Sequence, residues 1–186
     1  IEILQGPRPV REVKSAVVFL VGTAPVHETA PNGVSSDDWY QQTVNNPILI
    51  LRREDAVYYF GNPQPGYTIP YALDAIFDHG GTTVIVVNVF DPRIHQTNGQ
   101  PDPTRVTSAD IIGSIDATTG KRKGLQIIDE LYSRFGFTAK LILAPVYCES
   151  PAVMTEMIAK AEQVRAMALI DAPAGLTPQQ VINARG

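Results

Sequence analysis

The stretch Val84–Phe90, which reads VIVVNVF, decides the fold class because Asn88 is its one polar residue. β-Branched residues dominate the stretch, and their side chains pack well on the pleated surface of a strand. An apolar run without polar alternation is typical of a strand that helices cover on both faces. The sequence therefore predicts a buried strand of a mainly parallel sheet at 84–90.

Four further short stretches have the same apolar character, and they lie on both sides of 84–90 along the chain: Ala16–Val21, Ile48–Leu51, Leu141–Ala144 and Met167–Ile170. Most of them are apolar at consecutive positions, so we expect both of their faces to be buried. Together with 84–90 they predict a central sheet of five strands.

The segments between these strands show the spacing of helices. Apolar residues recur every three or four positions from Ile69 to Phe77, which predicts a helix with one buried stripe. Thr68 is expected to cap the beginning of this helix, and Gly80-Gly81 is expected to end it.

The same spacing predicts two longer helices in the second half of the chain. One covers 125–135 and is closed by Gly136, and the other covers 151–164 and is capped by Ser150. Shorter helices are expected over Glu54–Phe60 and from Thr177-Pro178 onward.

Two polar stretches, 25–46 and 91–107, are predicted to be long loops, the second with a turn at Asn98-Gly99. In the second half of the chain strands and helices then alternate, as they do in right-handed βαβ units. The expected fold class is α/β: a mainly parallel central sheet flanked by helices, with Rossmann-like layering.

The composition fits a globular α/β domain and argues against several other classes of protein. Of the 186 residues, 44% are hydrophobic and 18% are charged, which is enough apolar material for a packed core. The net charge is −4, whereas nucleic-acid binding depends on clustered positive charge, so no nucleic-acid partner is expected. The apolar runs are shorter than the ~18 residues of a membrane span. The single Cys148 cannot form a disulfide within the chain.

The loop after the first predicted strand lacks a phosphate-binding motif. Val21–Pro25 contains one glycine, and Pro25 has no N–H to offer to a phosphate. His27, His79 and His95 are dispersed and do not have the spacing of a metal site. We therefore expect neither a cofactor nor a metal, despite the Rossmann-like layering.

An enzyme or small-molecule binder of flavodoxin-like shape is the alternative interpretation, because ligands of such sheets bind where the strands end. Asp91 and Asp171 follow two of the predicted strands, and two carboxylates in one crevice could perform acid–base catalysis. The opposing interpretation is that both aspartates belong to turns, where Asp and Pro are common. Cys148 is expected to be a small, partly buried thiol rather than a nucleophile.

Two groups of residues suggest contacts with other proteins. Lys121-Arg122-Lys123 follows the turn Asp116–Gly120, and we interpret it as a solvated loop, with a protein–protein contact as the next hypothesis. An aromatic group either marks an interface or folds back over the sheet: Trp39, Tyr40, Tyr58, Tyr59, Phe60 and Tyr67.

Several blocks, in order along the chain, resemble the sheath proteins of contractile phage tails and of R-type bacteriocins. GPRPVR at 6–11 and SAVVFLVGTAP at 15–25 are similar to the way these proteins open, with an apolar strand that ends in V-G-x-A. NPILI at 46–50, with the DA and FG pairs that follow it, resembles the family block N-x-P-V-L-I … D-A … F-G.

The most specific block is DIIGSID at 110–116 with TGKRKGLQ at 119–126, continued by LILAP at 141–145. It resembles the sheath pattern I-I-G … G-x-x-T-G-L-x-A-L … P-x-L-L-x-A-P, with Lys123 in place of the usual threonine. VRAMALID at 164–171 resembles the later block L-R-A-x-A-I-L-D. Sheath proteins are about twice as long as this chain or longer, so the resemblance implies the N-terminal portion of a sheath subunit.

The resemblance implies a structural subunit and not an enzyme. In this family, subunits stack as helical rings around a tail tube, and the sheath shortens to drive the tube through the host envelope. The implied partners are other sheath subunits, the tail tube protein and the baseplate. The implied location is the virion, after assembly in the bacterial host cytoplasm. A bacteriocin or secretion-type injection machine would use the same mechanism in a non-viral context.

The family pattern divides the chain into a remnant of an N-terminal arm at 1–14 and an α/β sheath core at 15–186. Terminal arms of sheath proteins add strands to the sheets of neighbouring subunits. The residues expected to contact other subunits are Glu2, Ile3, Leu4, Arg8, Lys121 and Arg122. The resemblance does not extend to the C-terminal half of the family's full-length protein, so this chain alone is expected to be a monomer.

Overall fold

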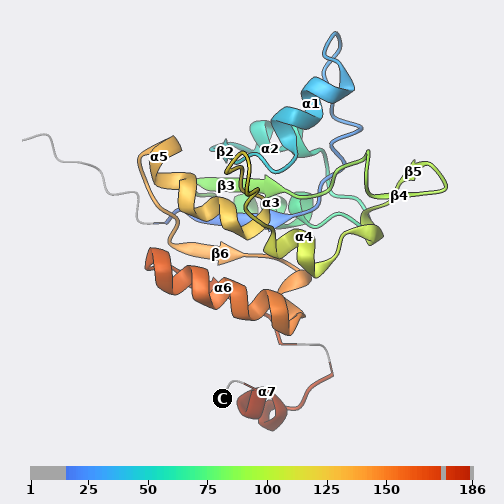
Figure 1. Cartoon of the computed structure of the whole chain (residues 1–186). Coiled ribbons are helices and arrows are strands. Elements are labelled where there is room, and N and C mark those ends of the chain that lie inside the picture. The colour runs from blue at the N-terminus through green and yellow to red at the C-terminus, as the bar shows by residue number, and fades with distance from the viewer. Residues whose placement is uncertain (1–15, 173–174, 185–186) are drawn as a thin grey trace, which may run out of the picture.

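A five-stranded sheet with the order β2-β3-β1-β6-β7 forms the centre of the computed structural model, which describes residues 16–172 and 175–184 (Figure 1). Its strands are β1 (Val18–Gly22), β2 (Ile48–Ile50), β3 (Val84–Asn88), β6 (Leu141–Leu143) and β7 (Met167–Leu169). β2 runs antiparallel to β3, and the other neighbours are parallel. The prediction of an α/β fold around a mainly parallel sheet is confirmed.

Helices cover both faces of the sheet (Figure 1). The α-helices are α1 (Ser36–Thr43), α2 (Arg53–Phe60), α3 (Ile69–Asp78), α4 (Ser108–Ile112), α5 (Leu131–Phe135), α6 (Pro151–Val164) and α7 (Pro178–Ala184). Short 3₁₀ helices are η1 (Pro103–Arg105), η2 (Gly124–Glu130) and η3 (Tyr147–Glu149). β4 (Gln96–Thr97) and β5 (Gln100–Pro101) form a hairpin around the predicted Asn98-Gly99 turn.

β1 and β3 are buried along their whole length, and their side chains alternate between two apolar layers. Phe19 of β1 belongs to the layer that contains Met157 of α6 and residues of η2. Leu20 points to the opposite layer, which contains Phe60 of α2 and Leu73 of α3. This arrangement explains why the strand sequences are apolar without alternation, as predicted.

The prediction of a loop over 25–46 is wrong in part, because α1 lies inside it. The Ser35 side chain caps this helix by accepting a hydrogen bond from the Asp38 N–H at 3.1 Å. Trp39 and Thr43 are the buried residues of α1, and two residues give too short a stripe for the helical spacing to be visible.

Thr68 and Ser150 stand at the N-cap positions of α3 and α6, as predicted, but neither side chain forms a capping hydrogen bond. The Thr68 hydroxyl does not cap α3 but accepts a hydrogen bond from the Thr23 N–H at 3.1 Å, which ties α3 to the end of β1. The Ser150 hydroxyl lies 3.1 Å from that of Ser108 and ties α6 to α4. The single helix expected over 125–135 is divided into η2 and α5, and Gly136 ends it in the left-handed conformation as predicted.

β7 forms one edge of the sheet and leaves apolar side chains exposed. Met167 is 62% exposed and Leu169 is 43% exposed. The register places them beside Leu141 and Leu143, which pack on the same layer as α2 and α3. Among the described residues, no helix is long and apolar enough to cross a membrane.

Candidate functional site

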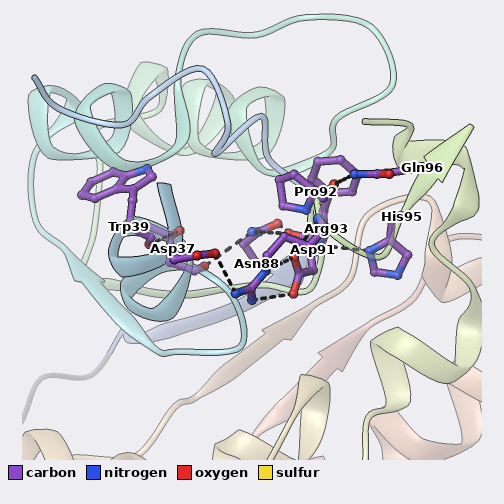
Figure 2. Close-up of polar contacts among 10 residues, drawn as sticks. Asp37, Trp39, Asn88, Asp91, Pro92, Arg93, His95 and Gln96 are labelled. Atoms are coloured by element: carbon purple, nitrogen blue, oxygen red, sulfur yellow. Dashed lines mark hydrogen bonds and ion pairs between the residues drawn. The ribbon is translucent and has the colours of Figure 1, made fainter. Parts of the chain in front are cut away.

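A cluster of polar residues forms where β3 ends, and Asn88 anchors it (Figure 2). The Asn88 side chain is fully buried. Its Oδ1 accepts hydrogen bonds from the Ala24 N–H at 3.0 Å and the Phe90 N–H at 3.1 Å. Its Nδ2 donates to the Phe90 carbonyl at 3.0 Å and to the Thr43 carbonyl at 3.5 Å. One amide therefore joins the last residue of α1 to the segments that follow β1 and β3.

Asp91 and Arg93 form the charged part of this cluster. Asp91 Oδ1 accepts hydrogen bonds from the Arg93 N–H and Nε, both at 2.9 Å, and Oδ2 accepts from Nη2 at 2.8 Å. The Arg93 guanidinium also lies 3.4 Å from an Asp37 oxygen and 5.5 Å from the centre of the Tyr40 ring. Arg93 thus connects the end of β3 to α1 (Figure 2).

The hydrogen bonds that Arg93 donates to both carboxylate oxygens of Asp91 hold Asp91 in its ionised form. Burial by itself would raise the pKa of Asp91, but the hydrogen bonds and charge of Arg93 outweigh it, so the pKa lies below its usual value. The hydrogen bonds to Asp91 raise the pKa of Arg93. A carboxylate that is stabilised as an anion and occupied on both oxygens is poorly suited to exchange protons with a substrate.

His95 completes the cluster on the side away from α1. The Asp91 N–H donates to His95 Nδ1 at 2.9 Å, so Nδ1 is the ring nitrogen without a proton. Nε2 faces an Asp110 oxygen at 3.7 Å, and the ring stacks on Phe90 with centroids 5.7 Å apart. Within the described residues, no three His, Cys, Asp or Glu side chains gather in a way that could hold a metal ion.

A cavity of about 430 Å³ lies over the polar cluster. Asp91, Arg93 and His95 line one side of it, and Lys121 and Lys123 of the predicted basic cluster line another. We call residues 116–123, the turn at Asp116–Gly120 with Lys121-Arg122-Lys123, the basic turn. The structure brings the basic turn next to the end of β3, which the sequence did not predict.

The basic turn itself is built on Asp116. Its carboxylate accepts hydrogen bonds from the N–H groups of Thr118 and Thr119, which hold the pKa of Asp116 below its usual value. Lys121 is exposed, whereas Arg122 is partly buried with its Nε 3.8 Å from Glu130. Lys121 is therefore available for a contact with another molecule, while Arg122 helps to hold the turn.

The structure does not bring the two candidate catalytic carboxylates together. Asp91 follows β3 and Asp171 follows β7, and β1 and β6 lie between these strands, so about three strand spacings, or ~14 Å, separate them. Asp171 is exposed and contacts the Cys148 sulfur at 3.8 Å. Cys148 is buried more completely than the partly buried thiol that the sequence predicts, and burial raises the pKa of this thiol, which disfavours a nucleophilic role.

The aromatic group largely folds back onto the protein. Trp39 is 2% exposed, stacks on Tyr59 with centroids 5.8 Å apart, and donates from Nε1 to the Thr29 hydroxyl at 3.2 Å. Phe60 and Tyr67 are buried as well. Of this group Tyr58, at 52%, is the large exposed ring.

Sequence reasoning missed Asn88, Arg93 and Asp37 as members of the polar cluster. The signal for Asn88 was its place as the one polar residue in VIVVNVF, because an amide buried in a strand must find partners. Arg93 stands two residues after Asp91, close enough for a local ion pair. No local signal points to Asp37, because α1 brings it there. Of the predicted subunit contacts, Glu2, Ile3, Leu4 and Arg8 lie outside the described residues.

Comparison with models of protein families finds no match. Two curated proteins are similar to the chain. It is 32% identical over 256 residues to the tail sheath protein of Burkholderia phage BcepMu, a match that covers 100% of this chain and 50% of the relative. It is 33% identical over 129 residues to a prophage major tail sheath protein of Pseudomonas aeruginosa strain UCBPP-PA14, covering 69% of this chain and 30% of the relative. The chain thus spans about half the length of the first relative and less of the second.

Proposed function

Because this chain belongs to the tail sheath protein family, we propose that it is the N-terminal part of a structural subunit of a contractile tail sheath. Copies of the subunit assemble as helical rings around a tail tube, and shortening of the sheath drives the tube through the host envelope. The observation that carries this proposal is the match of the whole chain to the tail sheath protein of phage BcepMu.

The construction of the fold supports a mechanical role. A subunit that moves as a body between two assemblies must be stiff and must offer alternative surface contacts. The sheet is buried between two apolar layers, and Asn88 and Arg93 tie its loops to α1. The charged residues after β3, Asp91 and Arg93, pair with each other and with Asp37 of α1, which favours a structural role for them.

The proposed partners are other sheath subunits, the tail tube protein and the baseplate. We place residues 1–14 in the arm that reaches a neighbouring subunit, with Glu2, Ile3, Leu4 and Arg8 as its contacts. Lys121 is the exposed contact in the core, and Arg122 supports its turn. The proposed location is the virion tail, after assembly in the bacterial host cytoplasm.

Electron microscopy of the product of the complete gene tests this function. Tubes built from stacked rings are expected. A folded product that forms only small particles, with or without purified tail tubes, would overturn the proposal. Lys121→Glu in that product should reduce the yield of tubes, whereas Arg165→Glu, which makes the same charge change at an exposed position on α6's end, should not.

The 186-residue chain alone provides a second test. Light scattering should give a mass near 20.2 kDa, because the chain spans about half the length of its phage relative and we expect assembly to need the other half of that length. Tubes or large helical particles from this chain by itself would show that assembly does not need the other half of the relative's length.

A further inference from the structure

The cavity over the polar cluster is built from four segments that lie far apart in the sequence. They are the end of α1 with the residues that follow it, the loop after β3, α4 and the basic turn. The cavity has a volume of about 430 Å³, which lies within the range of small-molecule sites, ~300–1,000 Å³. Loops at the carboxyl end of a sheet strand are also where ligands of α/β proteins bind.

The His95 ring brings a hydrogen-bond donor without a partner to this cavity (Figure 2). Its side chain is 9% exposed. Because Nδ1 accepts the hydrogen bond of the Asp91 N–H, the ring proton is on Nε2. Within the described part of the chain, Nε2 makes no hydrogen bond, since the Asp110 oxygen that it faces is 3.7 Å away. A buried donor left in this state favours a ligand that brings an acceptor oxygen.

The basic turn brings two ammonium groups to the cavity, those of Lys121 and Lys123. The charge of Lys123 also acts on Asp116. Among the described residues, however, neither ammonium group takes part in an ion pair or a hydrogen bond. Arg93, in contrast, is already paired with Asp91. Lys121 and Lys123 are therefore the positive charges that the cavity can offer to an anion.

Asp110 brings a negative charge to the same cavity and limits which anions fit. Its Oδ2 accepts hydrogen bonds from the N–H and the hydroxyl of Thr107 at 2.8 and 2.7 Å. Its Oδ1 accepts none within the part of the chain that the structure describes. This carboxylate repels an anion without protons, whereas an anion that carries an O–H group can donate a hydrogen bond to it. The cavity thus favours an anion with an O–H group.

Phosphate combines acceptor oxygens, negative charge and an O–H group. We propose that the cavity binds a protonated phosphate group, which accepts hydrogen bonds from Lys121, Lys123 and His95 Nε2 and donates its O–H to Asp110. The ligand is inorganic phosphate or a phosphate monoester, which share this chemistry. Val21–Pro25 lacks a backbone phosphate cradle, and the site proposed here uses side chains instead.

Titration of the ¹⁵N-labelled 186-residue chain with inorganic phosphate tests the proposal. The titration is run at about pH 6, with sodium chloride adjusted to keep the ionic strength constant. NMR should show saturating shifts at the basic turn, at α4 and at the His95 ring, with a Kd of about 1 mM or below. No saturation, or saturation centred elsewhere, would overturn the proposal.

Sulfate is the matched control ligand, because it has the size and shape of phosphate but carries no O–H group at this pH. It should bind about tenfold more weakly or worse, since a site that accepts a ligand's O–H discriminates against an analogue without one. Equal affinities for the two anions would show a general attraction of anions to lysine and would overturn the proposal.

A double variant tests the two lysines. Lys121→Met with Lys123→Met should weaken phosphate binding about tenfold or more, because both charge-assisted hydrogen bonds are lost. Lys140→Met with Arg165→Met removes the same charge before β6 and after α6, outside the cavity, and should leave the affinity unchanged. Equal losses in the two double variants would contradict a specific site.

Asp110→Asn tests the acceptor of the phosphate O–H. The amide oxygen can still accept from Thr107, so the start of α4 should be retained, which the urea midpoint checks. The variant should bind phosphate and sulfate with similar affinities, because the carboxylate that distinguishes them is gone. A preference for phosphate that stays unchanged would overturn the role of Asp110. The lysine variants test the site even if this variant fails to fold.

Methyl phosphate separates the two sources of the phosphate group. At about pH 6 roughly half of a phosphate monoester carries a proton. Tighter binding of inorganic phosphate would identify the free ion as the ligand, and equal or tighter binding of methyl phosphate would identify a monoester. These measurements need no assembly, so the inference goes beyond the proposed sheath role, and each can fail without the other.

Discussion

At the scale of single residues, the Asn88 side chain holds together two loops and the end of α1. Asn88→Ala would leave the buried N–H groups of Ala24 and Phe90 without their acceptor. Each unpaired buried group costs about 1–3 kcal/mol, so for the two groups we expect the free energy of unfolding to fall by about 2–6 kcal/mol. Urea unfolding followed by circular dichroism measures this, with Asn62→Ala on an exposed loop as a control that should change little.

The ion pair of Asp91 and Arg93 makes a prediction about pH. The pKa of Asp91 is lowered in the folded state, so its contribution to stability is complete above about pH 4 and is lost as the pH falls through the folded pKa. In Arg93→Met the guanidinium no longer lowers the pKa of Asp91, so ionised Asp91 contributes less to stability at pH 7 and less of that contribution is lost as the pH falls. The difference in unfolding free energy between wild type and variant should therefore be largest at pH 7 and shrink toward pH 3.

Urea unfolding at pH 7, 5, 4 and 3 tests this prediction. Arg52→Met is the control, because Arg52 pairs with Asp55 on the surface and its removal should cost little at each pH. A difference for Arg93→Met that stays constant over the whole range would show that Arg93 stabilises the fold through packing alone.

Residue patterns predicted the position of Asp91 better than its role. Its place after an apolar run showed that it lies where a strand ends, and the structure confirms this. Its partners could not be predicted in full, because Asp37 comes from a helix whose two buried residues leave no visible stripe. Arg122 illustrates the same limit, since its nearness to Glu130 depends on how η2 folds back.

At the scale of elements, the strands were predictable because burial on both faces leaves a strong local signal, whereas caps were not. Thr68 and Ser150 have the right residue type for a cap, yet their hydroxyls form tertiary hydrogen bonds instead. The residue type predicts that a buried hydroxyl forms a hydrogen bond. The partner depends on how α3 packs on β1 and how α6 packs on α4, which the local sequence does not show.

The close approach of α4 to the basic turn depends on Gly113. Its φ is +72°, and a Cβ built there would lie 1.9 Å from the Lys123 carbonyl oxygen. Gly113→Ala should therefore cost more than about 3 kcal/mol or prevent folding, because backbone would have to move. Gly33→Ala, at φ +86° with open space around it, should cost only about 1 kcal/mol. Thermal unfolding and soluble yield of the two variants compare them, and equal losses would contradict the steric explanation.

At the scale of the whole molecule, the exposed edge of the sheet predicts association behaviour. Met167 and Leu169 are exposed on an edge strand, and such edges promote aggregation. The double variant Met167→Lys with Leu169→Lys should raise solubility in ammonium sulfate and change the unfolding free energy by less than about 1 kcal/mol. Ala152→Lys with Ala159→Lys adds the same charge on exposed positions of α6. An equal gain in solubility for this control would assign the effect to charge and not to the edge.

The central place of β1 gives the molecule a direction of mechanical strength. β1 lies between β3 and β6 and runs parallel to both, and the chain enters it directly after Ala16. A force applied to the segment before Ala16, along the strand, loads the hydrogen bonds to both neighbours in shear, so many of them must break together. A strand at the edge would instead peel away one bond at a time. Tension from a tethered neighbour would therefore reach the strongest part of the fold first, and the domain could be pulled as one body.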